Sequence, residues 1–137
     1  MTSHTIEKSL ILAAAPANVW AFLTDPDKLA IWFHRPDNAL TSPGPFSMPG
    51  EDGEPLVWGE VREARAPSHL SYSFTARPMG GHMTEVTWEL SELEAGTRLR
   101  LTHSGIPAGA EAFGLLTGFD GGWDRHLLSL REASAAD

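Results

Sequence analysis

The chain has 137 residues, of which 42% are apolar and 20% charged, so we expect one folded domain over residues 1–137 and exclude a disordered chain. Ten Lys and Arg against 18 Asp and Glu give a net charge of −8, so nucleic acids and anionic membranes are not expected partners. The absence of cysteine excludes disulfides and Cys-ligated zinc, and no stretch approaches the roughly 20 apolar residues of a membrane-spanning helix, so we expect a cytoplasmic protein.

The N-terminal part of the chain predicts a strand followed by two short helices. Residues 5–12 alternate in the period-2 pattern of a strand, with Lys8 as the one polar residue on the apolar parity. A proline at the first helical position then suits a helix over residues 16–23 with one apolar face. Asp25-Pro26 ends this helix and opens a second one, in which apolar residues recur at i, i+3 and i+4 from Leu29.

The middle of the chain predicts a loop and then a run of strands. Residues 41–55 hold four prolines and three glycines, which favours a surface loop in which residues 46–48 could form a brief edge strand. The segments that follow alternate between apolar and polar residues or begin with an apolar run, as half-buried strands do. They cover residues 56–64, 70–75, 85–90 and 98–103, with a hairpin turn at Glu94–Gly96.

The C-terminal segment changes to the period of a helix. Its apolar residues step by three or four positions, which places them on one stripe. Glycines interrupt the segment without changing the phase of the stripe, and we therefore predict one long helix that bends near Gly121 and Gly122. The stripe consists of Ala112, Leu116, Phe119, Trp123, Leu127 and Leu130.

These elements together predict an α+β fold. Antiparallel strands with one apolar face need a cover, and the last helix is the only long element that can supply it. We expect a curved antiparallel sheet wrapped around the C-terminal helix, with the two short helices after the first strand. A sheet that curves around one helix leaves a hollow between them, and ligand sites are commonly such apolar hollows.

Several short segments occur in an order that is typical of one group of proteins. They are Ala15–Trp20, Leu23–Pro26, Val86–Leu90, Leu101–Gly105 and Gly122–Asp124. Together they resemble the START-related (SRPBCC) superfamily, and within it the group similar to the C-terminal domain of the activator of heat-shock-protein-90 ATPase. The resemblance runs from about residue 5 to 133 and implies a helix-grip fold with an internal cavity.

The resemblance implies several different functions. Members of the superfamily carry lipids or hormones, cyclise polyketides or serve as partner modules, and a fold does not choose among these. The ATPase activator itself resembles this chain over only one half, and we expect no counterpart here of its separate N-terminal chaperone-binding domain.

The candidate ligand-binding residues are inward-facing aromatic and polar side chains. His103 has the inward parity of its strand, so its imidazole could bind a ligand, shuttle a proton or form a structural hydrogen bond. Indole rings could wall a cavity or fill the core, and Tyr72 could bring a phenolic hydroxyl into it. The expected binding residues are Trp58, Tyr72, Phe74, Trp88, Leu101, His103, Leu116, Phe119 and Trp123.

Other polar residues are expected to be exposed or structural. Asp120 and Asp124 lie at i, i+4, where they could hold a cation, cap a helix or face solvent. We expect His126 to be exposed. The spacings of His82, His103 and His126 match no metal motif, and no cofactor motif is present, so no metal or cofactor is expected.

Three functions follow as hypotheses. The first is a non-catalytic carrier or sensor of a small hydrophobic molecule. The second is a cavity enzyme of the cyclase, hydrolase or dehydratase type, in which His103 acts as acid or base and Tyr72 orients an oxyanion. The third is a protein-interaction module related to chaperone ATPase activation, with an exposed apolar patch. A homodimer is compatible with each of them.

Overall fold

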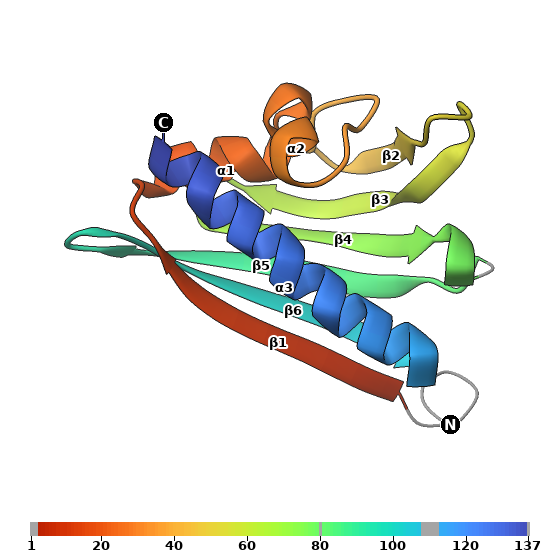
Figure 1. The fold of residues 1–137 in the computed structure, drawn as a ribbon. Helices are drawn as coiled ribbons and strands as arrows, with labels where there is room; N and C mark the ends of the chain where they lie inside the picture. The colour runs from red at the N-terminus through yellow and green to blue at the C-terminus, as the bar shows by residue number, and fades with distance from the viewer. Residues whose placement is uncertain (1–2, 80, 108–112, 137) are drawn as a thin grey trace.

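The first and last strands of the sheet lie side by side, so the chain returns to its start before the final helix (Figure 1). A computed structural model describes residues 3–79, 81–107 and 113–136. The described residues form a six-stranded antiparallel sheet in the order β1-β6-β5-β4-β3-β2. The strands are β1 (Ser3–Leu12), β2 (Gly44–Pro49), β3 (Pro55–Arg65), β4 (His69–Ala76), β5 (Thr84–Leu93) and β6 (Gly96–Pro107). The helices are α1 (Pro16–Thr24), α2 (Pro26–Trp32) and α3 (Phe113–Ala136), and a 3-10 turn, η1 (Arg77–Met79), precedes β5.

The two short helices begin at the residues the sequence predicts, and the first ends one residue later than predicted, at Thr24. Asp25 separates them, because its backbone N–H donates to the Ala21 carbonyl at the end of α1 while its side chain accepts from the Lys28 N–H at the start of α2. Pro16 and Pro26 each stand at the start of a helix, where a missing N–H costs nothing. This arrangement carries the chain from β1 across the sheet to β2 (Figure 1).

The proline- and glycine-rich segment contains an edge strand, as the sequence allows. Residues 44–49 pair with β3 as β2, with Phe46 opposite Gly59. The hairpin after β5 is also where it is expected, since Leu93 pairs with Gly96. The edge position accounts for the prolines at both ends of β2, because an edge strand tolerates a missing donor.

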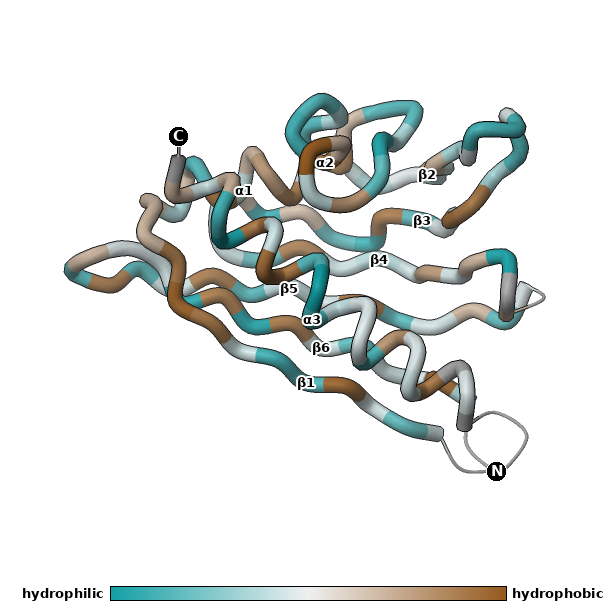
Figure 2. The backbone as a smooth tube through the Cα atoms, viewed as in Figure 1, coloured by the Kyte–Doolittle hydropathy of each residue, from teal (hydrophilic) through white to brown (hydrophobic). Residues whose placement is uncertain are grey.

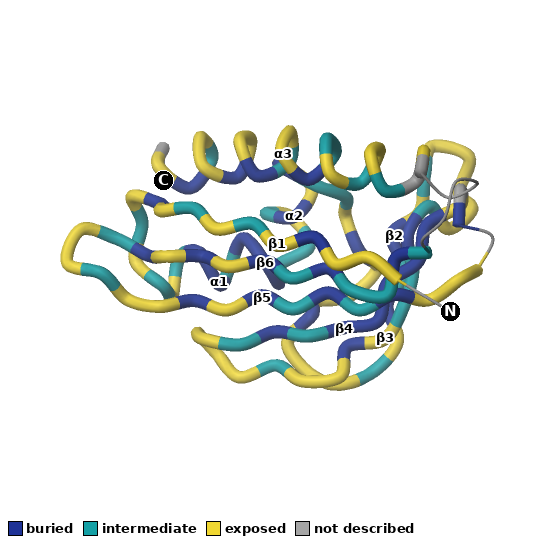
Figure 3. The backbone as a smooth tube through the Cα atoms, turned by 90° about the horizontal axis from the view of Figure 1, so that it is seen from below, coloured by how far each residue is buried: buried dark blue, intermediate teal, exposed yellow. Residues whose placement is uncertain are grey.

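The C-terminal helix runs without interruption from Phe113 to Ala136, and it passes straight through the glycine pair (Figures 1 and 3). The bend predicted near Gly121 and Gly122 is therefore wrong, since both glycines keep helical hydrogen bonding. Ala112, the first residue of the predicted stripe, lies outside the described residues. None of the helices in the described ranges is long and apolar enough to cross a membrane.

The sheet buries one face under the helices, and β5 and β6 alternate between buried and more exposed residues (Figure 3), with apolar residues recurring along the strands (Figure 2). Val86, Trp88 and Leu90 of β5 face the helices, while Glu89 between them is exposed. Along α3 the stripe is buried at Leu127 and Leu130 but only half-buried at Leu116 and Phe119. The predicted α+β helix-grip fold is confirmed, and α3 is less deeply covered in its N-terminal half.

Candidate ligand cavity

A cavity of about 230 Å³ opens where the N-terminal half of α3 meets the end of α2 and the strands β3 and β4. Its walls are mostly apolar and its polar groups are two imidazoles. An apolar cavity of about 150 Å³ is large enough to bind benzene, so this one has room for a larger planar ring. The lining residues are Phe33, His34, Leu56, Val57, Phe74, Ala76, Gly118, Phe119, Gly122, Trp123 and His126.

The α3 side of the cavity is formed by residues at helical spacing. Gly118, Gly122 and His126 recur at i, i+4, so they share one face of the helix. A Cβ added at Gly118 would meet nothing within 4 Å, and one at Gly122 would meet only the end of the Arg125 side chain at 3.9 Å. Packing therefore does not require glycine at either position, although glycine weakens a helix interior. The missing side chains leave space beside the cavity.

The opposite side of the cavity is formed by the end of α2. Phe33 ends this helix with non-helical backbone angles, and its N–H donates to the Leu29 carbonyl. The Phe33 ring stacks on Trp123, with centroids 5.5 Å apart, and thereby joins α2 to α3. Leaving the helical path at Phe33 brings the next residue, His34, to the cavity.

His126 is half-buried between α3 and the end of α2. Its Nδ1 lies 2.9 Å from the Trp32 carbonyl oxygen, and because a carbonyl only accepts, Nδ1 carries the hydrogen and donates it. Nε2 has no hydrogen-bond partner among the described residues. Burial lowers the pKa of His126, opposed by the hydrogen bond to Trp32, and the charge of Arg125 lowers it further. The expected exposure of His126 is therefore wrong, because the end of α2 covers its ring.

His34 is the second imidazole of the cavity. Its ring centroid lies 5.8 Å from that of His126, and neither of its nitrogens forms a hydrogen bond within the described part of the chain. Burial lowers the pKa of His34, and the nearby His126 lowers it further because two adjacent imidazolium ions repel. The cavity thus holds two neutral imidazoles at neutral pH.

His103 lies behind the cavity wall and is fully buried. The Trp123 indole Nε1 donates to its Nδ1 at 3.0 Å, so Nε2 carries the ring hydrogen and donates to the Thr84 hydroxyl at 2.7 Å. The Thr84 hydroxyl in turn donates a hydrogen bond to the Phe74 carbonyl oxygen at 2.7 Å. Burial lowers the pKa of His103 to about 4. Both nitrogens of a neutral ring are thus in use, which supports a structural role and leaves no atom for acid–base chemistry.

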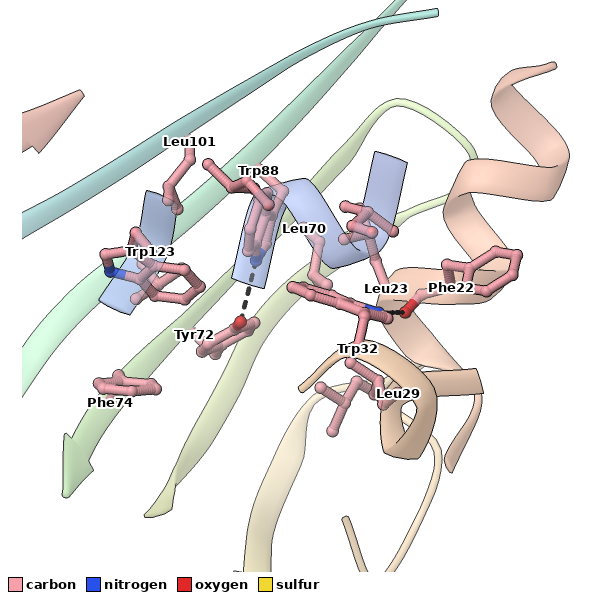
Figure 4. Packing of buried hydrophobic residues seen from close by; sticks show 14 of the residues in the cluster. Phe22, Leu23, Leu29, Trp32, Leu70, Tyr72, Phe74, Trp88, Leu101 and Trp123 are labelled. Carbon is pink, nitrogen blue, oxygen red and sulfur yellow. Dashed lines mark hydrogen bonds between the residues drawn. The ribbon is translucent and has the colours of Figure 1, made fainter. Parts of the chain in front are cut away.

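Tyr72 and Trp88 form a second buried polar pair (Figure 4). The Trp88 indole donates to the Tyr72 hydroxyl at 2.9 Å, and burial raises the pKa of this phenol well above its usual range. Trp88 also makes edge contacts with Trp32 and Trp123, so it fills the core between both helices and the sheet. The pair lies deeper than the cavity, and Tyr72 is not in a position to orient an oxyanion there.

The structure places only part of the expected binding residues at the cavity. Phe74, Phe119 and Trp123 line it. The remaining six lie elsewhere: Tyr72, Trp88, Leu101 and His103 in the core, Leu116 toward β1, and Trp58 outside the core cluster.

Trp58 needs a correction, because it lies on the opposite parity from the core. Val57 and Val61 are the buried residues of β3, so Trp58 belongs to the outer parity and is only half-buried. Its segment begins with an apolar run in which the inward parity is ambiguous. Leu116 lies outside the cavity for another reason, since it lines a groove between α3 and β1.

Sequence reasoning missed His34, the glycines Gly118 and Gly122, and most of the wall from α2 and β3. A signal for the α3 residues was present, because Gly118, Gly122 and His126 repeat at i, i+4 beside the apolar stripe. No periodic signal marks His34, which follows the helix in an irregular segment.

Asp120 and Asp124 do bind a cation, but it is a lysine of the same chain. Lys8 Nζ lies 2.7 Å from one carboxylate and 2.9 Å from the other. The hydrogen bond to Asp120 is the main reason why the pKa of Lys8 is raised, opposed by partial burial and assisted by Asp124. Within the described ranges no three His, Asp or Glu side chains gather in a way that could hold a metal ion.

Comparison with known proteins agrees with this architecture. The family model described as "Activator of Hsp90 ATPase homolog 1-like protein" matches residues 13–135. No curated protein matches the chain.

Solved structures show the same fold. Protein MLL2253 from Mesorhizobium loti is 22% identical with a TM-score of 0.82, and the match covers 94% of this chain and 95% of that one. CalU16 from Micromonospora echinospora is 27% identical with a TM-score of 0.73, covering 94% and 71%. The Aha1 dimer from Colwellia psychrerythraea is 20% identical with a TM-score of 0.80, covering 96% of each chain. The sequence match and the shared fold together show that this chain belongs to the Activator of Hsp90 ATPase homolog 1-like family.

Proposed function

We propose that this protein binds a small, planar hydrophobic molecule in the cavity between α3, the end of α2 and the sheet, as a non-catalytic carrier or sensor. The observation that carries the proposal is the glycine face of α3. Gly118 and Gly122 border the cavity, a methyl group would fit at each, and their absence keeps space open at a cost in helix stability.

The walls support the same ligand class. Aromatic rings from three elements surround the space, with Phe33 from the end of α2, Phe74 from β4 and Phe119 from α3. Such faces suit stacked or edge contacts with a planar ring. A volume of about 230 Å³ is below the usual range for drug-sized ligands, which favours a molecule of one or two rings.

The proposal is tested by closing the cavity from the glycine face. The double variant Gly118→Leu/Gly122→Leu fills the space, and the matched variant Gly114→Leu/Gly121→Leu changes two glycines of the same helix that do not line it. Thermal shift and fluorescence titration with 2-naphthol and 2-naphthamide measure binding.

We expect both probes to bind and stabilise the wild type, since a ligand at a hundredfold excess over Kd adds about 2.7 kcal/mol. The control variant keeps this response and the cavity variant loses it. Failure of every naphthalene-sized probe to bind the wild type would overturn the proposal, and so would undiminished binding to the cavity variant.

The other two functions find less support in the geometry. His103 has no free nitrogen and does not line the cavity. The exposed large apolar residues, Ile11, Ile31, Met83 and Leu128, belong to four separate segments of the described chain. A homodimer remains a proposal, which the solution mass by light scattering tests directly.

A further inference from the structure

The two imidazoles of the cavity share one side of it, and we call His34 and His126 the imidazole corner. The other lining side chains are apolar, so a bound molecule can form side-chain hydrogen bonds only at this corner. His126 offers Nε2, because its Nδ1 is held by Trp32, and His34 has both nitrogens available within the described chain. A ligand that uses this cavity fully therefore has an apolar ring and one polar end.

The charges beside the corner favour an acidic polar end. The guanidinium nitrogens of Arg125 lie 3.5 Å from a Cβ built on Gly121 and 3.9 Å from one built on Gly122; its charge lowers the pKa of His126, and it forms no ion pair within the described ranges. The carboxylates of Asp120 and Asp124 are on another side of α3, bound to Lys8. Although the chain carries −8 overall, a cation without an ion pair in the described ranges thus stands beside His126, outside the cavity lining.

We propose that the cavity selects an aromatic carboxylic acid, whose ring lies against Phe74 and Phe119 and whose carboxylate binds the imidazole corner. This inference rests on the proposed function and adds the chemical class of the ligand.

Protonation follows from the chemistry of the two partners. A carboxylate only accepts hydrogen bonds, and the free Nε2 of a neutral His126 also only accepts. A neutral His34 can donate one hydrogen bond from whichever nitrogen carries its hydrogen, but binding of the carboxylate by both imidazoles requires a proton on His126 Nε2, taken from solvent, which turns that contact into a charge-assisted hydrogen bond. Arg125 from α3 and the second imidazole oppose this protonation in the free protein, and the incoming carboxylate offsets them. Arg35, the neighbour of His34 in the chain, is already paired with Asp27.

The experiment compares 2-naphthoic acid with 2-naphthamide, which has the same ring and nearly the same shape but no charge. Affinities are measured by calorimetry from pH 6 to pH 8, in two buffers of different ionisation enthalpy. The variant His126→Asn keeps a side-chain N–H near the Nδ1 position for the Trp32 carbonyl and removes Nε2. The variant His34→Phe keeps a ring and removes both nitrogens.

For the wild type we expect the acid to bind about tenfold or more tightly than the amide at pH 6, with uptake of about one proton. The affinity for the acid falls as the pH rises, while that for the amide does not change. Both variants lose the preference for the acid and keep amide binding. Equal affinity for the two probes would overturn this inference and leave the proposed function standing, whereas binding of neither probe would overturn both.

Discussion

The indole Nε1 of Trp123 donates to Nδ1 of His103 at 3.0 Å, and this bond joins the middle of α3 to β6 in the core. Because an indole can only donate, the bond selects the neutral tautomer of His103 with hydrogen on Nε2. The same hydrogen then directs the Thr84 hydroxyl to the Phe74 carbonyl. One cavity-lining side chain therefore sets a chain of buried hydrogen bonds that ends at another lining residue.

Removing the indole donor should destabilise the fold. Trp123→Phe keeps an aromatic ring but leaves Nδ1 of His103 buried without a partner, which costs about 1–3 kcal/mol. Urea denaturation measures the change in the free energy of unfolding. Trp58→Phe is the matched control, since Trp58 is half-buried and its indole forms no hydrogen bond within the described chain, and it should cost less. Equal losses in the two variants would contradict the importance of this bond.

Protonation of His103 should occur only well below neutral pH. Its folded-state pKa of about 4 lies below the ordinary value of 6.5, so the unfolded chain binds this proton first. The stabilisation from a neutral His103 is therefore fully present above pH 6.5 and is lost as the pH falls toward 4, by about 3 kcal/mol in total.

Two measurements check that His103 takes up its proton at a lower pH in the folded protein than in the unfolded chain. In an NMR pH titration, the His103 resonance should remain unshifted until the pH approaches 4, whereas an exposed histidine shifts near 6.5. Urea midpoints at pH 7 and pH 5 should show the corresponding loss of stability. A His103 midpoint near 6.5 would show that the ring is solvated and that the buried network does not persist in solution.

The fold could be predicted because its signals are local and periodic. The alternation in β5 and the Asp25-Pro26 break between the short helices each appear within a few adjacent residues. Lys8 illustrates what local signals do not predict, namely contacts between residues far apart in the sequence. Its inward parity was visible as an exception, but its partners Asp120 and Asp124 come from the far end of the sequence.

The cavity could be predicted only in part, because parity shows which face a side chain takes and not what covers it. Tyr72 and Phe74 share one parity, yet Phe74 reaches the cavity while Tyr72 packs beneath it. His34 lies in an irregular segment without periodicity, and the burial of His126 depends on how α2 approaches α3.

Alanine at the cavity glycines should stabilise the fold. Gly118→Ala and Gly122→Ala each add a good helix former where a methyl group fits, which raises the free energy of unfolding by up to about 1 kcal/mol. Gly59→Ala is the contrasting case, since its Cβ would lie 1.9 Å from the Ser73 carbonyl oxygen and force two strands apart. Chemical denaturation should therefore give opposite signs for the two kinds of glycine. Destabilisation by Gly118→Ala would mean that the space beside it is filled in solution.

The ion pairs of Lys8 should contribute little to stability, although two carboxylates surround it. Both carboxylates are more than half exposed, at 53% and 60%, and water screens such pairs. Lys8→Met keeps the apolar stem on the inward face of β1 and should change the free energy of unfolding by less than about 1 kcal/mol. The difference from wild type should shrink further between 0.05 and 1 M NaCl, because salt screens exposed charges. A loss of several kcal/mol that persists at high salt would instead show that this pair anchors α3 to β1, and that its helix position, and hence the cavity, depends on Lys8.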